Sequence, residues 1–184
     1  MRETSTPSME MVTQFISVDQ FLEPWRSQLH KVCEASGVES YHIKKDSRLH
    51  SAAVKLIRIA YGPEEPTQPE RNEAVEEADW LLQVLAPGDV GDEKAMALIQ
   101  DEFWFTLAGR TLFQTLKFSL GEAFCDLEEA AGRLRIPKAR LYHWVATKRV
   151  PSYVSEDDGY GRRKFRVRLD QVERVLADGE ERAG

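Results

Sequence analysis

Cysteine is scarce in this sequence of 184 residues, in which only Cys33 and Cys125 occur. Two cysteines so far apart do not make the disulfide framework of a small secreted domain. No apolar run approaches the roughly 20 residues that span a bilayer. The first residues are polar and include acids, unlike the basic and apolar segments of a signal peptide. We therefore expect a cytoplasmic protein with no membrane partner.

Signatures of catalysis and of cofactor binding are also missing. The sequence contains no glycine-rich phosphate loop and no nucleophile elbow. His30 and Cys33 lie three residues apart, with His42 and His50 further along, but no CxxC or HxxxH pair fixes the geometry of a metal site. Solvated histidines and a half-buried thiol are the simpler interpretation. We expect no enzyme activity, no metal and no cofactor.

Charge is distributed unevenly along the chain. The formal net charge is −6, but residues 1–125 hold 12 basic and 20 acidic residues, whereas residues 126–184 hold 13 and 11. Eleven of those basic residues fall within residues 133–168, against three acids. Affinity for nucleic acid depends on the local field at the contact surface. The C-terminal third is therefore the candidate for binding nucleic acid, although a solvated basic face would have the same composition.

Apolar residues recur at helical spacing through the first two-thirds of the sequence. After a tail over residues 1–13, they predict a first helix from near Asp19 to residues 36–37, with Pro24 tolerated near its start or marking a kink. Three further helices are expected from about residue 46 to 62, from a capping box at Thr67 and Glu70 to residue 86, and from about residue 92 towards 110. Residues 111–124 fit a strand or a helix, and we favour a helix that breaks near Gly121. We thus predict a helical domain over residues 14–123, which resembles no family known to us.

The residues from 124 to 178 change pattern. Asp126 and Glu129 occupy N-cap and N3 positions of a short helix, and small residues in the middle of its apolar face allow a second helix to approach closely. Pro137 can occupy the first position of that second helix. Leu141, Trp144 and Val145 then face inwards, and the opposite side carries polar and small residues: Lys138, Ala139, Arg140, Tyr142, His143, Ala146 and Thr147.

Two strands and a last helix follow. Residues 151–155 and 163–167 bracket an Asp-Gly turn signal, which predicts a β-hairpin. The return strand alternates cations with apolar residues, so one face can pack on helices while the other meets phosphates. A final helix from Asp170 to about Ala177 closes the core with Val172, Val175 and Leu176.

Five short segments of this region match, in order, the motifs of a known domain family. They lie over about fifty residues, at 126–136, 141–145, 149–151, 163–167 and 171–176. In order and spacing they resemble the EEAAxxLGV helix, the YRWI recognition helix, the RLP wing entry, the RRYRI wing strand and the closing DLExFL helix of MerR/excisionase-like winged helix-turn-helix domains. The resemblance implies a mainly α protein, with an N-terminal helical domain, a winged helix-turn-helix over residues 124–178 with a short β-hairpin wing, and a tail over 179–184.

The resemblance also implies which residues bind DNA. The recognition helix of that family reads the major groove, and the basic residues of the wing hold the backbone. Carried onto this chain, the DNA-binding candidates are Lys138, Arg140, Tyr142, His143, Thr147, Arg149, Arg162, Arg163, Lys164 and Arg166. Trp144 and Phe165 are expected in the core.

Three positions depart from the family pattern. Pro137 replaces the usual Ser or Thr cap, so the second helix lacks that side-chain hydrogen bond. Lys148 stands where a glycine usually follows the recognition helix, which puts a left-handed cap in doubt. Arg168 stands where a small polar cap usually opens the last helix.

These features predict a sequence-specific DNA-binding protein that regulates transcription and associates with the nucleoid. Only seven residues follow the last predicted helix, too few for the dimerising coil of MerR-type regulators. A homodimer would therefore form through the N-terminal domain, with exposure of some of Trp80, Trp104 and Phe105 supplying an apolar patch. The alternatives are an architectural phage or plasmid protein, such as an excisionase, a segregation protein or a packaging adaptor, and an antitoxin-like interaction adaptor. A basic hairpin that contacts RNA or protein remains a third interpretation.

Overall fold

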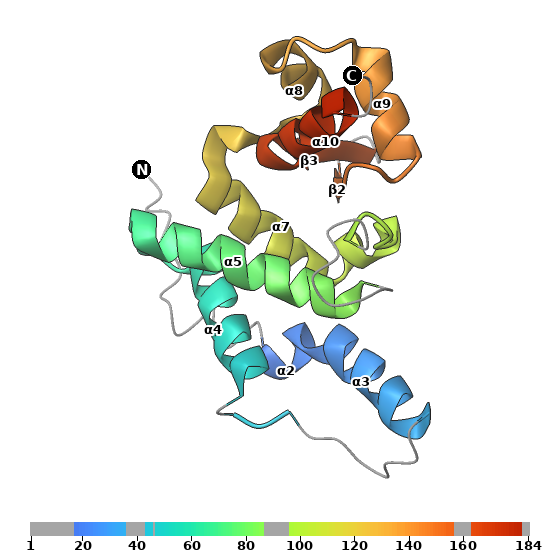
Figure 1. Cartoon of the computed structure of the whole chain (residues 1–184). Coiled ribbons are helices and arrows are strands. Elements are labelled where there is room, and N and C mark those ends of the chain that lie inside the picture. Colours follow the sequence, from blue (N-terminus) through green and yellow to red (C-terminus); the bar gives the residue numbers. More distant parts are fainter. Residues whose placement is uncertain (1–16, 36–42, 46, 87–95, 157–162, 182–184) are drawn as a thin grey trace.

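Helices form most of the described chain, and a small antiparallel sheet lies between two groups of them (Figure 1). The structure is a computed structural model that describes residues 17–35, 43–45, 47–86, 96–156 and 163–181. The secondary structure confirms the expectation of a mainly α chain with a short β-hairpin. Within these ranges no helix is long and apolar enough to cross a membrane.

The first predicted helix is two helices. α2 covers Val18–Phe21 and α3 covers Glu23–Ala35, with the chain turning at Leu22. Pro24 has no N–H to donate to the preceding turn, and the second position of α3 tolerates it. Ser17, rather than Asp19, caps α2, because its side chain accepts from the Asp19 N–H.

The next two helices follow the sequence prediction. α4 (Arg48–Tyr61) is capped by Ser47 and ends at Gly62, and α5 covers Gln68–Leu85. The capping box at the start of α5 is present, and the Glu70 carboxylate accepts from the Thr67 N–H at 2.9 Å and from its hydroxyl at 2.8 Å. These helices bury the apolar faces expected of them, Leu56 and Leu81 included.

The prediction of a fourth helix running to residue 110 is wrong. A 3₁₀ helix, η1, covers Asp101–Phe105, and a new helix, α7, covers Leu107–Leu120. Thr106 separates the two helices and caps both of them. Its hydroxyl donates to the Phe103 carbonyl at 2.6 Å and accepts from the Gly109 N–H at 3.1 Å. A Cβ on Gly109 would lie 2.1 Å from the Phe103 carbonyl oxygen. The glycine therefore lets η1 fold back onto the first turn of α7.

α7 ends where the sequence suggested, at Gly121 in a left-handed conformation (φ 53°). The segment favoured as a helix is therefore helical, and a short 3₁₀ turn, η2 (Gly121–Ala123), leads from it into the sheet. The first strand, β1 (Phe124–Asp126), was not predicted. Three residues are too few to show an alternating pattern.

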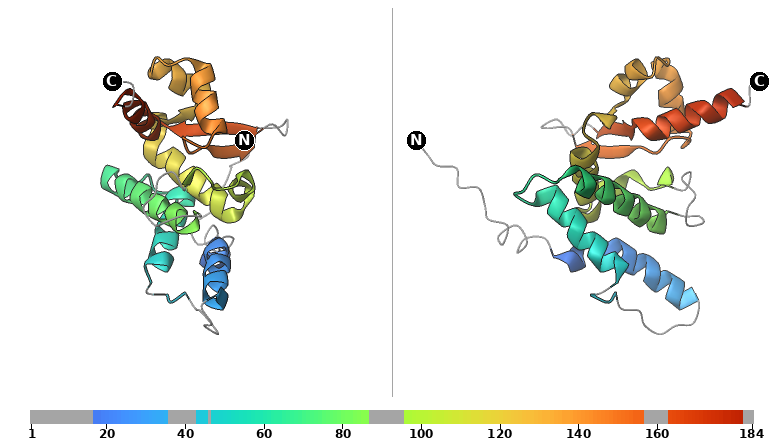
Figure 2. Two further views of the ribbon diagram at one scale, coloured as in Figure 1. Left: turned by 45° about the vertical axis from the view of Figure 1, so that its right-hand side comes forward. Right: turned by 60° about the vertical axis from the view of Figure 1, so that its left-hand side comes forward.

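The sheet has the strand order β1-β3-β2, and both pairs are antiparallel. β2 covers Tyr153–Glu156 and β3 covers Arg163–Arg168, which confirms the predicted hairpin; its tip lies outside the described residues. Helices α8 (Leu127–Arg133), α9 (Lys138–Ala146) and α10 (Leu169–Glu181) cover the face of the sheet that is turned away from α7 (Figures 1 and 2). The last helix is longer than expected.

Two hydrophobic cores meet at the sheet. We call α2 to α5, η1 and α7 the helical part. Phe124 and Tyr153 belong to its core, together with Trp25, Leu56 and Leu112. Cys125 and Val167 belong to the second core, which α8, α9 and α10 share. The sheet is therefore a common wall of the two parts. The predicted domain boundary between residues 123 and 124 therefore separates Phe124 and Tyr153 from the helical core in which they are buried.

Candidate nucleic-acid interface

α8 and α9 follow each other closely in the chain and pack together. The Asp126 carboxylate caps α8 by accepting from the Glu129 N–H at 2.8 Å, as the sequence predicted. Ala130 and Ala131 are buried, and small side chains there let the two axes approach closely. Leu141, Trp144 and Val145 of α9 are all buried, as expected.

Both helices end in the same left-handed turn, a Schellman motif. After α8, Arg135 (φ 53°) donates to the Gly132 carbonyl at 3.3 Å, and Ile136 donates to that of Ala131 at 3.0 Å. After α9, Lys148 has a φ of 58°. The doubt that the sequence raised about a left-handed cap at Lys148 is therefore answered, since the cap forms without a glycine.

The hydrogen bonds of the second turn repeat those of the first. Lys148 donates to the Val145 carbonyl at 3.0 Å, and Arg149 donates to the Trp144 carbonyl at 2.8 Å. An L side chain in this conformation costs about 1 kcal/mol that a glycine avoids. Both turns thus hold a cation at some expense in stability.

Pro137 lies one position earlier than the sequence placed it. It is the N-cap of α9, not the first helical residue, and it makes no side-chain capping bond, as expected. Its carbonyl still accepts from the Arg140 N–H at 2.9 Å. The fixed φ of proline suits this position.

α9 presents its polar face to solvent. All of the α9 candidates are exposed: Lys138, Arg140, Tyr142, His143 and Thr147. Tyr142, at 48% exposure, is one of the few large hydrophobic side chains of the described chain that stand out from the surface. The structure therefore brings these predicted residues together on one helix and its C-terminal turn.

Trp144 links the exposed face of α9 to the core. Its ring is buried, yet the Arg140 guanidinium carbon lies 4.7 Å from the ring centroid and that of Arg149 lies 5.7 Å from it. Stacking on an aromatic face limits the conformations of a guanidinium. Lys138 is held differently, by an ion pair of 2.9 Å with Glu128 of α8.

The wing cations are placed differently from the expectation that one strand face is free for phosphates. Arg163 is bound to two acids of η1, at 3.1 Å to Asp101 and 3.4 Å to Glu102. Arg166 donates to the Phe124 carbonyl at 2.9 Å. Lys164 is exposed, and Arg162 lies outside the described residues.

Arg168 is a buried link between the two parts of the chain. Its side chain is 5% exposed, and it pairs with Asp79 of α5 and, at 2.9 Å, with Asp170 of α10. Burial raises the pKa of Asp79, against the opposing effect of Arg168. Burial alone would lower the pKa of Arg168, but Tyr153 and the two carboxylates raise it above its ordinary value. The sequence showed Arg168 only as a departure from the family pattern, because its partner is far away in the chain.

Of the three aromatic residues suggested for a dimer patch, Trp104 is buried, and Trp80 and Phe105 are half-buried. Trp104 is 3% exposed and packs against Tyr153, with ring centroids 5.1 Å apart. Trp80 is half-buried under the Arg48 guanidinium, 4.1 Å from its ring centroid. The large hydrophobic side chains exposed on the described helical part are instead Val54, Leu98 and Phe118.

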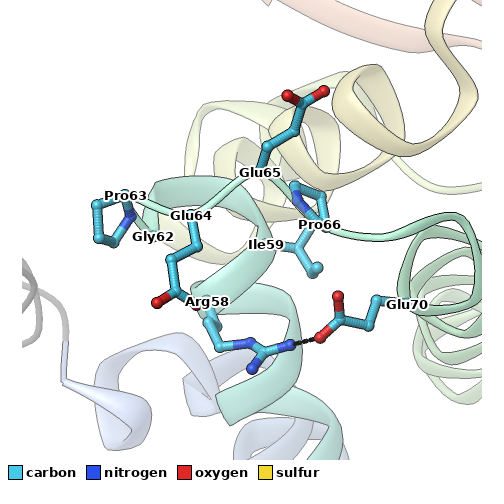
Figure 3. A pocket seen from close by; sticks show the side chains of 8 residues that line it. All are labelled: Arg58, Ile59, Gly62, Pro63, Glu64, Glu65, Pro66 and Glu70. Carbon is cyan, nitrogen blue, oxygen red and sulfur yellow. Dashed lines mark hydrogen bonds and ion pairs between the residues drawn. The ribbon is translucent and has the colours of Figure 1, made fainter.

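A concave site lies at the connector of residues 62–66, which joins α4 to α5. Figure 3 shows Arg58 and Glu70 pointing towards one another there, in an ion pair. Hydrogen bonds from Thr67 and Arg58 lower the pKa of Glu70 to about 2. Both charges are thus used in fixing the start of α5. Among the described residues no three His, Cys, Asp or Glu side chains gather into a metal site; His42 and the Cys33 side chain lie outside the described part.

No family model, no curated protein and no solved structure matches the chain.

Proposed function

We propose that this chain is a non-enzymatic, sequence-specific protein that binds double-stranded DNA and regulates transcription. One observation carries the proposal. α9 buries Leu141, Trp144 and Val145 and exposes its other face, with Arg140, Tyr142 and His143, to solvent. A helix with this division, held by a second helix behind it, is what a major groove admits.

The exposed side chains have the chemistry that reads base edges. Arg140 can donate two parallel hydrogen bonds to guanine, and Tyr142, His143 and Thr147 offer donors, acceptors and apolar surface. Ala139 and Ala146, both exposed, allow close approach of the helix. Stacking of Arg140 on Trp144 lowers the entropy lost when its guanidinium meets a base.

Cations around this face would hold the phosphates. Arg149 lies directly after the α9 cap and is exposed, and Lys164 is exposed on β3. Arg163 is a weaker candidate than the sequence suggested, because phosphate would have to displace Asp101 and Glu102. The proposed interface therefore centres on α9 and its C-terminal turn.

One winged helix reads few base pairs, so the proposal includes a homodimer through the helical part. Phe118 is the best placed apolar contact for it, since it is 50% exposed near the end of α7. Light scattering of the wild type and of Phe118→Glu tests this. A monomeric wild type would remove the dimer from the proposal.

The test of DNA binding is selection of binding sites from random duplexes, followed by mobility shifts with the full chain. A truncation at residue 122 is unsuitable because it would remove Phe124 and Tyr153 from the helical core. Arg140→Gln should lower affinity for the selected site by roughly 10- to 100-fold. Arg26→Gln, which removes one half-buried arginine from α3, is the control for loss of a cation outside α9 and should change the affinity little.

Failure to select any sequence would contradict the proposal. So would equal binding by the wild type and Arg140→Gln. Cooperative coverage of tandem sites in a footprint would instead favour an architectural role over regulation. Recovery of a stoichiometric protein partner, without DNA binding, would favour the interaction adaptor.

A further inference from the structure

A pocket of about 210 Å³ lies between the helical part and the wing. Four aromatic rings contribute to its walls: Tyr61 of α4, Trp104 and Phe105 of η1, and Phe113 of α7. Val154 of β2 lies in the opposite wall. A cavity of roughly 150 Å³ lined by apolar side chains holds benzene, so this one has room for a single substituted ring.

Apart from Gln114 and Ser155, the polar groups that line the pocket are the Tyr61 hydroxyl, which lies 3.4 Å from the Thr111 hydroxyl, and Arg110. Arg110 of α7 lies at its edge and makes no ion pair with any described residue. The indole N–H of Trp104 is buried and has no hydrogen-bond partner in the described part of the chain, but it is closed off from the pocket by the surrounding atoms, so it offers no donor there. An aromatic wall with an exposed, unpaired cation at its edge is typical of a ligand pocket.

We propose that this pocket binds a small aromatic carboxylate. The ring would lie among Tyr61, Phe105 and Phe113. The carboxylate would pair with Arg110. An apolar molecule alone would leave Arg110 unused, and an aliphatic acid would fill the aromatic walls poorly.

The position of the pocket makes the ligand an effector of the wing. Val154 and Ser155 of β2 line one side, and η1 on the other side holds β3 through Asp101 and Arg163. Anything that fills the space bears on both strands of the hairpin. This effector role rests on the proposed function, whereas binding of the ligand does not.

The test uses the full chain without DNA. Benzoate, benzyl alcohol and cyclohexanecarboxylate are titrated while the indole N–H signals are followed by NMR, with Trp104→Phe assigning its resonance. We expect the Trp104 signal to shift with benzoate at a dissociation constant of about 0.1–5 mM. The two probes that lack either the charge or the aromatic ring should bind at least fivefold more weakly.

Two variants of α7 separate the roles of its side chains. Arg110→Gln should weaken benzoate binding at least fivefold and leave benzyl alcohol binding unchanged. Gln114→Phe, which fills the pocket from a half-buried position, should abolish both. Lys117→Gln, on the same helix and away from the pocket, is the control and should alter neither.

The site is overturned if benzoate leaves the Trp104 signal in place up to 20 mM, or if Arg110→Gln binds it as the wild type does. The effector role is judged separately, on DNA selected by the wild type. Saturating benzoate should change the affinity for that DNA at least threefold, and a smaller change would overturn this part. If no DNA is selected at all, the NMR titration still decides the pocket.

Discussion

Arg168 of β3 and Asp79 of α5 lie 89 residues apart in the sequence and form an ion pair at the junction of the two parts of the chain. Asp170 binds the same guanidinium, and Tyr153 beside it donates to Gln171 at 3.1 Å. The sheet is thus tied to α5 by charge as well as by the shared core. Any displacement of β3 from α5 must break this pair.

Removing the arginine should be costly. In Arg168→Met, Asp79 keeps a largely buried carboxyl without its counter-charge, and such losses are about 3–5 kcal/mol. We expect urea unfolding to show a loss of about 3 kcal/mol. Arg174→Met is the control, because Arg174 binds the same Asp170 at 3.0 Å but is exposed, and should lose under about 0.5 kcal/mol.

A double variant distinguishes an unpaired charge from lost packing. Arg168→Met with Asp79→Leu removes both charges, and an apolar pair in place of a buried ion pair is often neutral. The double variant should therefore be more stable than Arg168→Met alone. Additive losses would show that the pair is not coupled.

Replacing Lys148 in the left-handed turn after α9 should have opposite effects on stability and on DNA affinity. Lys148→Gly should raise the free energy of unfolding by about 0.5–1 kcal/mol, because glycine adopts a φ of 58° without steric cost. It should also weaken DNA binding, since the cation next to Arg149 is lost. Lys148→Ala loses the same charge but keeps the strained conformation, so it should weaken DNA binding without the gain in stability.

The loss of folding stability at low pH should depend on Glu70. Its pKa is lowered to about 2 by hydrogen bonds from Thr67 and Arg58, from a reference value of 4.5. A lowered folded-state pKa gives stability that is full above about pH 4.5 and is lost as the pH falls towards 2. The difference in Tm between the wild type and Glu70→Gln should therefore be largest near pH 7 and shrink towards pH 2.5. A difference that stays constant over this range would contradict the role of the charge, and Glu76→Gln controls for the loss of an exposed acid.

Local patterns were sufficient to predict most helices and the hairpin. The capping box at Thr67 and the cap at Asp126 depend on residues within three positions of each other, so the sequence displays them. The break at Thr106 was missed although its cap is local, because apolar residues at helical spacing continue through it. Local and distant causes both act in the site. The exposed face of α9 follows from helical periodicity, whereas the η1 acids that bind Arg163, and Asp79, which binds Arg168, lie more than 60 residues away from them.

The salt dependence of DNA binding should separate the cations that meet phosphate from those that hold the fold. Each phosphate contact contributes about 0.9 to the slope of log K against log salt. Arg149→Ala should reduce the slope by about 1, because this guanidinium is exposed and bound only loosely over Trp144. Arg163→Ala should change it by less than half as much, because Asp101 and Glu102 already neutralise that cation. A full unit lost in Arg163→Ala would mean that DNA displaces the η1 acids, and that the wing leaves the helical part when the protein binds.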